Sequence, residues 1–423
     1  MNRLTLHQLW NQRRANAWLL AELIIVTYFL WGAIDPVYVI LSNRAIPDGY
    51  DLSDTYLLQV KSYHSGHRLF RQEATTDSAQ NADFKRIVER IEHYPGVTAT
   101  TVVLNGSYPQ SGSWSGSAFK HDTLRVDLQC MCFLSGTDYF GVFRIKNAKG
   151  QVIPPVPAGT KAYYLTQNAA QRLFLKGDAK GECFFTRTND TLTQLRVQEV
   201  LPVIQSRSVE QPYPLLLETQ DKLSVSTSRV EICFRVRDGL ASQALTDKLK
   251  KELSPLCQSG NFQLSAIHYF PVFAQKLEAI FGTTGTVRLQ ICLVSFFLLC
   301  TFLGMVGTFW LRSNARREEI GLRMALGSTQ QMIHRQFLFE AWVLTTIGFF
   351  IGLFLVFQHV WHDGFAQATR NGDLAYWQNQ PVAHFLFVSL LVYLLLVIIA
   401  IIGTWIPAAR AARTQPVEAL RDE

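Results

Sequence analysis

The sequence predicts a helical membrane protein with four transmembrane helices and a large extracytoplasmic mixed α/β domain inserted between the first and second helix. Two observations support this fold class. Long apolar runs lie near the start of the chain and in its last third, and the charged residues concentrate outside them. The 423 residues are 48% hydrophobic and 17% charged. This balance is too polar for a chain that lies wholly in a membrane and too apolar for an ordinary soluble enzyme.

The three later runs cover residues 291–311, 341–357 and 385–406. The first and last are long enough to cross about 30 Å of hydrocarbon as α-helices. The middle run reaches that length if it begins near Phe337, which would place Glu340 at the cytoplasmic edge. We therefore expect three transmembrane helices in this part of the chain.

The first apolar run, residues 18–41, contains two acidic residues, Glu22 and Asp35. Because Arg13 and Arg14 precede the run, a cleaved signal peptide is an alternative. The acid inside the run, the bulky Trp31 and the lack of a small-x-small cleavage pattern favour a retained transmembrane anchor instead. Acids that face lipid are costly, so we expect both to lie at the membrane interfaces rather than to form a buried functional pair.

The cations define one topology. Lysine and arginine next to transmembrane segments are retained on the cytoplasmic side. With four spans, the cationic clusters before the first span, between the second and third, and after the fourth all fall on that side. These clusters are Arg3, Arg13 and Arg14; Arg312, Arg316, Arg317, Arg323 and Arg335; and Arg410, Arg413 and Arg421. Both termini are then cytoplasmic, residues 42–286 lie outside, and the net charge of +7 does not indicate nucleic-acid binding.

The external region has the patterning of a mixed α/β domain. Apolar spacing predicts helices at 83–94, 242–253 and 272–281, and alternation or Val/Thr enrichment predicts strands at 97–104, 124–133 and 230–236. The proline-rich segment 151–159 is expected to be a loop. The predicted units are residues 1–41, with the cytoplasmic N-terminal segment and the first span, residues 42–286, the external α/β domain, and residues 287–423, the last three spans with a cytoplasmic loop at 312–336. A helix at 272–281 would lead almost directly into the second span and would transmit motion.

Catalytic and cofactor-binding motifs are missing from the sequence. It has no G-x-x-x-x-G-K-[ST] phosphate-binding loop and no H-E-x-x-H metal motif. His64 and His67 lack a third ligand at a recognisable spacing, so a surface loop is favoured over a metal site. A second set of polar residues lies near the external ends of the last two spans: His359, His362, Asp363 and His384. We interpret them as residues of the membrane interface, with proton or metal handling as the alternative. Of the seven cysteines, Cys292 and Cys300 are expected in a span, and the five external ones are interpreted as small apolar core residues. We expect a non-enzyme with no cofactor or metal of its own.

The segment 316–329 between two apolar runs carries more than topological charge. On a helix, Ile320, Met324 and Gly327 share one face, and the charged residues cover the remainder. Such a helix can lie on the inner membrane surface or insert into a groove of a partner, and spacing alone favours neither. A second local pattern, Gly348-x-x-x-Gly352, predicts close helix packing in the third span.

Three motifs resemble the MacB/FtsX-like ABC transporter permease family. Residues 316–327 (RREEIGLRMALG) resemble its R-R-x-E-I-G-x-R-x-A-x-G loop, residues 336–340 (QFLFE) its entry to the third span, and residues 407–421 its P-A-x-x-A-x-x-x-x-P-x-E-A-L-R ending. The resemblance assigns ATPase coupling to Arg316, Arg317, Glu318, Glu319, Ile320, Gly321, Arg323, Ala325 and Gly327. It assigns a C-terminal motif to Pro407, Arg410, Arg413, Pro416, Glu418, Ala419 and Leu420.

The resemblance implies a mechanotransmission permease in the bacterial inner membrane. ATP would be bound and hydrolysed by a separate cytoplasmic ABC ATPase, and the chain would pair with itself or with a second FtsX-like permease. A periplasmic membrane-fusion protein is a further expected partner. The output would be export of an amphiphile, such as a peptide, drug or lipoprotein. The alternative is a non-transporting signalling permease that regulates periplasmic cell-wall hydrolases; a membrane-anchored periplasmic enzyme is disfavoured.

Overall fold

The computed structural model describes residues 13–111, 115–188, 191–226, 228–280, 283–363 and 381–412. The chain divides into two compact units. The first combines Met1–Leu41 with Thr284–Glu423, and the second is the inserted segment Ser42–Thr283. Each unit has its own apolar cores.

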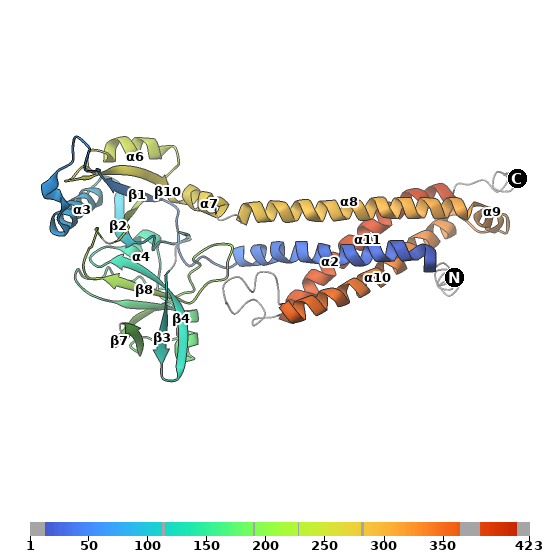
Figure 1. Ribbon diagram of the computed structural model, residues 1–423, viewed down its shortest axis with the longest axis horizontal. Coiled ribbons are helices and arrows are strands. Elements are labelled where there is room, and N and C mark those ends of the chain that lie inside the picture. The colour runs from blue at the N-terminus through green and yellow to red at the C-terminus, as the bar shows by residue number, and fades with distance from the viewer. Residues whose placement is uncertain are drawn as a thin grey trace. The chain divides into compact units, whose positions relative to one another are not determined.

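Four long helices make up the first unit: α2 (Arg13–Arg44), α8 (Thr283–Ala315), α10 (Gln330–Asp363) and α11 (Pro381–Ala412). Each contains an apolar stretch long enough to cross a membrane. Two clusters of buried apolar side chains hold the helices together, one around Leu23, Phe309 and Phe337 and the other around Leu30 and Val392. The predicted four spans with an inserted domain are therefore confirmed (Figure 1).

A short helix, α9 (Arg317–Ala325), lies between α8 and α10. The second and third spans extend further than their apolar runs, because α8 continues to Ala315 and α10 begins at Gln330. Much of the segment 312–336 is therefore helix continuous with the spans. Only residues 316–329 lie between the two long helices.

The inserted unit contains ten strands in one branched sheet. They are β1 (Thr55–Ser62), β2 (Val97–Leu104), β3 (Ser115–His121), β4 (Leu124–Leu134), β5 (Tyr163–Thr166), β6 (Cys183–Thr188), β7 (Thr191–Leu201), β8 (Leu215–Gln220), β9 (Val230–Val236) and β10 (Phe262–Tyr269). The order is β10-β1-β9-β2-β4-β3-β6-β7-β5-β8, and β8 also pairs with β4. The strands from β4 to β8 therefore close into a ring, while β10, β1, β9 and β2 form an antiparallel sheet beside it.

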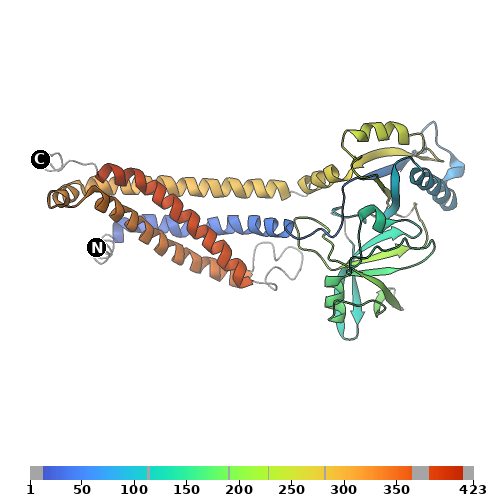
Figure 2. The ribbon, with the colours of Figure 1, turned by 180° about the vertical axis from the view of Figure 1, so that it is seen from behind.

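Helices cover the two parts of this unit. α3 (Asp77–Glu92) lies against β2 and α6 (Leu245–Leu253) against β10, as Figure 1 and, from behind, Figure 2 show. These helices place Ile87, Ile91 and Leu249 in the core of the antiparallel sheet. α5 (Gln167–Phe174) contributes Leu173 to the core of the ring. The short α4 (Tyr139–Phe143) and α7 (Phe270–Ile280) contribute aromatic rings to a third core. A 3-10 turn, η1 (Gln72–Thr75), precedes α3.

Several predicted elements are confirmed with shifted boundaries. β2 and β9 occupy their predicted residues, and α3 begins earlier than predicted because Thr76 caps it by accepting a hydrogen bond from the Ala79 amide. The apolar face of β9 is buried as expected. Its other face is buried too, since Arg235 donates to the Val142 carbonyl of α4. The junction between α7 and α8, at residues 281–282, lies outside the described residues.

Polar contacts within the second unit fix the last turn of α2. The Asn43 side chain donates to the Val209 carbonyl at 2.9 Å, and the buried Gln205 donates back to the Asn43 carbonyl at 2.9 Å. Arg44 pairs with Glu278 of α7 at 3.1 Å. Burial and the negative charge of Glu278 raise the pKa of the nearby Asp48 carboxyl. The end of α2 and helix α7 are therefore joined through one ion pair.

Candidate functional site

The backbone of α9 explains why glycine and threonine follow it. The Ser328 amide donates to the Arg323 carbonyl at 3.0 Å, and the Gly327 amide donates to the Met324 carbonyl at 3.1 Å. This is the Schellman arrangement that ends helices, and it requires the left-handed conformation that Gly327 adopts with φ +99°. Thr329 then accepts a hydrogen bond from the Met332 amide at the start of α10. The sharp turn between α9 and α10 is therefore encoded locally.

One face of α9 is buried against the ends of the long helices. Ile320 is 6% exposed and joins an apolar cluster with Phe337 of α10 and with Ala408 and Ala411 of α11. Gly321 is also buried. The loop motif and the described part of the C-terminal motif, which lie far apart in the sequence, therefore meet in one core.

A polar network fastens α9 to α10. Nη1 of Arg316 lies 3.1 Å and 3.2 Å from the two carboxylate oxygens of Glu340, which is 1% exposed. Gln336 donates to Glu340 at 3.2 Å and accepts from Arg323 at 3.1 Å. Arg323 also pairs with Glu319 at 2.5 Å. Two arginines of the motif therefore fix the position of α9 within the chain.

The other motif residues form an outward face. Arg317, Glu318 and Ala325 are exposed. Two large apolar side chains lie among them, Leu322 at 54% and Leu326 at 79% exposure. We call these five residues the α9 face. Of the residues assigned to coupling, Arg316 and Arg323 make the intrachain contacts described above, whereas sequence reasoning did not select Leu322 and Leu326. Their exposure depends on which side of α9 packs against the bundle, and the spacing does not specify that side.

Part of the C-terminal motif is described. Pro407 and Arg410 lie in the last turns of α11, and the Arg410 guanidinium sits 4.3 Å from the ring centroid of Trp310 on α8. The other motif residues, Arg413, Pro416, Glu418, Ala419 and Leu420, lie outside the described residues.

The paired glycines of α10 lie against α2. A Cβ atom at Gly348 would lie 2.6 Å from the Leu23 Cβ, and one at Gly352 would lie 2.7 Å from the Thr27 Cβ. These separations are too short for any side chain, so the two helices approach as closely as their backbones allow. The contact is within the chain.

The two acids of α2 have different surroundings. Asp35 is fully buried, and its Oδ1 lies 2.5 Å from Nε2 of the equally buried His384 on α11. The ring of Tyr38 lies 4.8 Å from the His384 ring, centroid to centroid. Glu22 lies against α8, where a Cβ at Gly304 would come within 2.4 Å of its carboxylate. The bundle therefore encloses Asp35 and His384 as a pair, a contact that the sequence did not predict, whereas the depth of these residues in a membrane stays a prediction.

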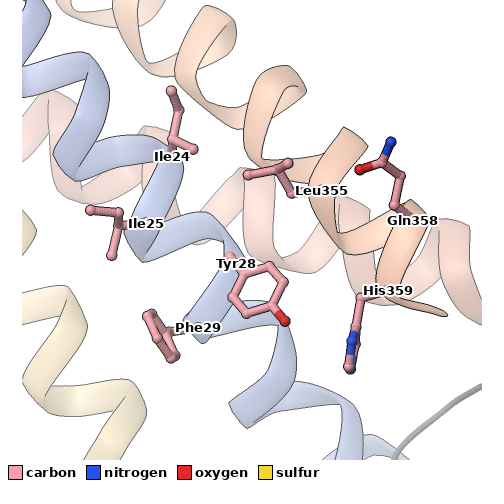
Figure 3. A pocket seen from close by; sticks show the side chains of 7 residues that line it. All are labelled: Ile24, Ile25, Tyr28, Phe29, Leu355, Gln358 and His359. Carbon is pink, nitrogen blue, oxygen red and sulfur yellow. The ribbon is translucent and has the colours of Figure 1, made fainter. Parts of the chain in front are cut away.

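A groove of about 470 Å³ runs between α2 and α10 (Figure 3). Its apolar part is lined by Ile24, Ile25, Phe29 and Leu355. Tyr28, Gln358 and His359 add polar groups to the lining. The groove therefore combines an apolar wall with several hydrogen-bonding groups. Among the described residues, no group of three or more His, Cys, Asp or Glu side chains could hold a metal ion.

Comparison with known proteins gives a consistent family. The FtsX-like permease C-terminal family matches residues 291–416. The macrolide export ATP-binding/permease protein MacB of Rhodopirellula baltica is 31% identical over 184 residues, 44% of this chain and 24% of that protein. A probable export ATP-binding/permease protein MacB of Pseudomonas entomophila is 25% identical over 315 residues, 72% of this chain and 44% of that protein. The chain thus spans less than half the length of these relatives.

A likeness to a solved structure was also found. The periplasmic region of MacB from Actinobacillus actinomycetemcomitans aligns with 54% of this chain and 94% of its own, at 13% identity and a TM-score of 0.34. The motifs around α9 and α11, the matched C-terminal domain and the sequence relatives all agree. Residues 291–416 therefore form an FtsX-like permease C-terminal domain, and the chain is similar to the permease part of MacB-type export proteins.

Proposed function

We propose that this chain is a mechanotransmission permease subunit in the bacterial inner membrane, with both termini in the cytoplasm and Ser42–Thr283 in the periplasm. A separate ABC ATPase binds the α9 face, and its ATP-driven movements are passed through the four spans to the inserted unit. The permease works as a dimer, and a periplasmic membrane-fusion protein receives the exported amphiphile. The chain itself is not an enzyme.

The observation that carries this proposal is the α9 face. The inner side of α9 contacts the bundle through an ion pair and an apolar core, so force on α9 can pass to the bundle. Its outer side presents two exposed leucines together with Arg317 and Glu318, an apolar and charged surface on which a protein can dock. Force applied there reaches α8, α10 and α11 directly.

The groove between α2 and α10 supports an amphiphilic cargo. It opens on helices that are apolar enough to span a membrane, so an apolar chain can reach Ile25 and Leu355 from the lipid phase. Polar groups of the same molecule can hydrogen-bond to Gln358 and His359, which lie near the end of α10 (Figure 3). The chemistry fits a molecule with an acyl-like part and a polar head.

The test is co-purification of the ATPase with the full chain. Leu326→Asp should abolish recovery of the ATPase while leaving membrane insertion intact, since Leu326 is 79% exposed and its loss removes no internal contact. Leu175→Asp is the matched control, because Leu175 is 75% exposed in the inserted unit. Undiminished ATPase recovery with Leu326→Asp would show that the ATPase binds elsewhere.

A second experiment distinguishes export from control of cell-wall hydrolases. If the complex exports amphiphiles, cells that carry a variant unable to bind the ATPase should accumulate the amphiphile in the cytoplasm or the membrane and should still separate normally. If the complex controls wall hydrolases, the same variants should form chains of unseparated cells without a change in efflux. The second result would replace export with signalling.

A further inference from the structure

The last turn of α8 contains a buried arginine whose two terminal nitrogens have no hydrogen-bonding partner within the part of the chain that the structure describes. Arg312 is 8% exposed, and among the described residues neither Nη1 nor Nη2 has a partner. Its guanidinium lies 5.1 Å from the ring centroid of Phe309, a contact that satisfies none of its N–H donors. An arginine cannot shed its charge in a protein, so this one is buried as a cation. Such a group is costly unless another arrangement of the chain supplies an acceptor.

The neighbouring arginine lies at the junction between α8 and α9. The Arg316 amide still donates to the Arg312 carbonyl at 3.1 Å, so the two residues are one helical turn apart. Arg316 leaves the helical conformation, with φ −109° and ψ 17°, and its carbonyl accepts from the Ile320 amide to start α9. The direction of α9 therefore sets the position of the Arg316 side chain, whereas the regular helix of α8 fixes Arg312.

Both arginines act on the same carboxylate. Glu340 binds Arg316 through both oxygens, while the charge of Glu340 attracts the Arg312 guanidinium and that of Arg316 repels it. Glu340 is 1% exposed, and a buried carboxylate is costly unless a cation lies beside it. A movement of α9 that withdraws Arg316 would leave the Glu340 carboxylate with the Gln336 hydrogen bond but without a cation, unless a second cation can replace Arg316.

We propose that Arg312 is the second partner of Glu340, which exchanges Arg316 for Arg312 when α9 pivots about residue 316. In the present arrangement Arg316 binds Glu340, and the two terminal nitrogens of Arg312 make no hydrogen bond to the described residues. In the other arrangement Arg312 holds Glu340, and α9 is released from α10 without exposing a buried charge. Arg312 is thus a positioning residue that acts through Glu340. The exchange of arginines at Glu340 needs no other protein. The role of this exchange in coupling to the ATPase rests on the proposed function.

The experiment measures the apparent unfolding temperature of the purified full chain in detergent. In an Arg316→Met background, Arg312 should take over Glu340. Glu340→Gln added to that background should then lower the unfolding temperature, because it removes the partner of Arg312 again. If Arg312 cannot reach Glu340, the same substitution relieves a bare buried carboxylate and raises the unfolding temperature. That rise would overturn the proposal.

Two further variants show which direction of change in the unfolding temperature Glu340→Gln causes when no arginine can bind Glu340, and whether the loss of an exposed arginine has any effect. In an Arg312→Met/Arg316→Met background no arginine remains for Glu340, so Glu340→Gln should raise the unfolding temperature there. The unfolding temperature of Arg312→Met/Arg316→Met should also be lowered by about 5 °C or more beyond the sum of the decreases in the two single variants. Additive decreases would argue against a carboxylate that both arginines can bind. Arg335→Met, a change at an exposed arginine of α10, should leave all of these values unchanged. If Glu340→Gln lowers the unfolding temperature in the Arg316→Met background but Leu326→Asp leaves ATPase recovery undiminished, the proposed function is overturned and the exchange at Glu340 stands.

Discussion

At the scale of residues, this membrane unit depends on a few enclosed polar pairs. Asp35 and His384 pair in the interior of the bundle, and Glu340 pairs with Arg316 near its end. The first pair joins α2 to α11, the second joins the α8–α9 junction to α10, and each uses groups that would be costly alone in an apolar setting. These pairs therefore specify which elements meet and at what register.

The Asp35–His384 pair yields a prediction about stability. Asp35→Leu alone or His384→Leu alone should lower the free energy of unfolding by about 3–5 kcal/mol, because each leaves the other group buried without its partner. The double variant Asp35→Leu/His384→Leu should recover most of that loss, since two leucines can fill the same interior. Thermal or denaturant unfolding of the full chain in detergent measures all three.

The control for this pair is His362→Leu, a histidine-to-leucine change at an exposed position of α10. It should alter stability by less than about 0.5 kcal/mol. If the double variant is as unstable as the sum of its single variants, the pair is not a unit and the two residues act independently.

At the scale of elements, the sequence predicted which segments would form helices but not how they would dock. Apolar runs identified all four spans, and strand patterning placed β2 and β9 at their observed residues. The partner of Arg316 depends on α10 passing beside the α8–α9 junction. That placement follows from packing around Ile320 and Phe337, which no periodicity encodes. For the same reason the sequence showed that residues 316–329 are amphipathic but not which side faces outward.

The close approach of α2 and α10 is the element contact most open to test. Gly352→Ala should destabilise the full chain by about 1–3 kcal/mol. The added Cβ would lie 2.7 Å from the Thr27 Cβ and 2.9 Å from the Ile24 carbonyl oxygen, and neither atom is the end of a flexible side chain.

Gly32 of α2 provides the matched control for Gly352. A Cβ at Gly32 meets nothing within 4 Å, so Gly32→Ala should be neutral or stabilise the helix by up to about 1 kcal/mol. Both variants are compared by their unfolding temperatures. Equal effects at the two positions would mean that the cost comes from helix propensity and not from the α2–α10 contact.

At the scale of the whole molecule, one span differs from the others. Only 11% of the apolar window of α8 is buried within the chain, against 44% for α2 and for α10. The exposed positions of α8 include a stripe with helical spacing, formed by Cys292, Phe296, Leu299, Leu303, Gly307 and Leu311. The proposed dimer requires a surface of this kind, because four spans make half of a transporter.

The stripe makes the dimer testable with a cysteine that the chain already has. Two copies in one membrane share their orientation, so a two-fold axis along the membrane normal makes facing residues meet their own counterparts. If α8 forms the interface, oxidation of native membranes should yield a dimer linked through Cys292, and Cys292→Ser should abolish it. Leu299→Cys, two turns further along the stripe, should restore the crosslink in that background. Phe354→Cys on α10, 59% exposed, should not. A crosslink through residue 354 but not through 292 or 299 would move the interface from α8 to α10.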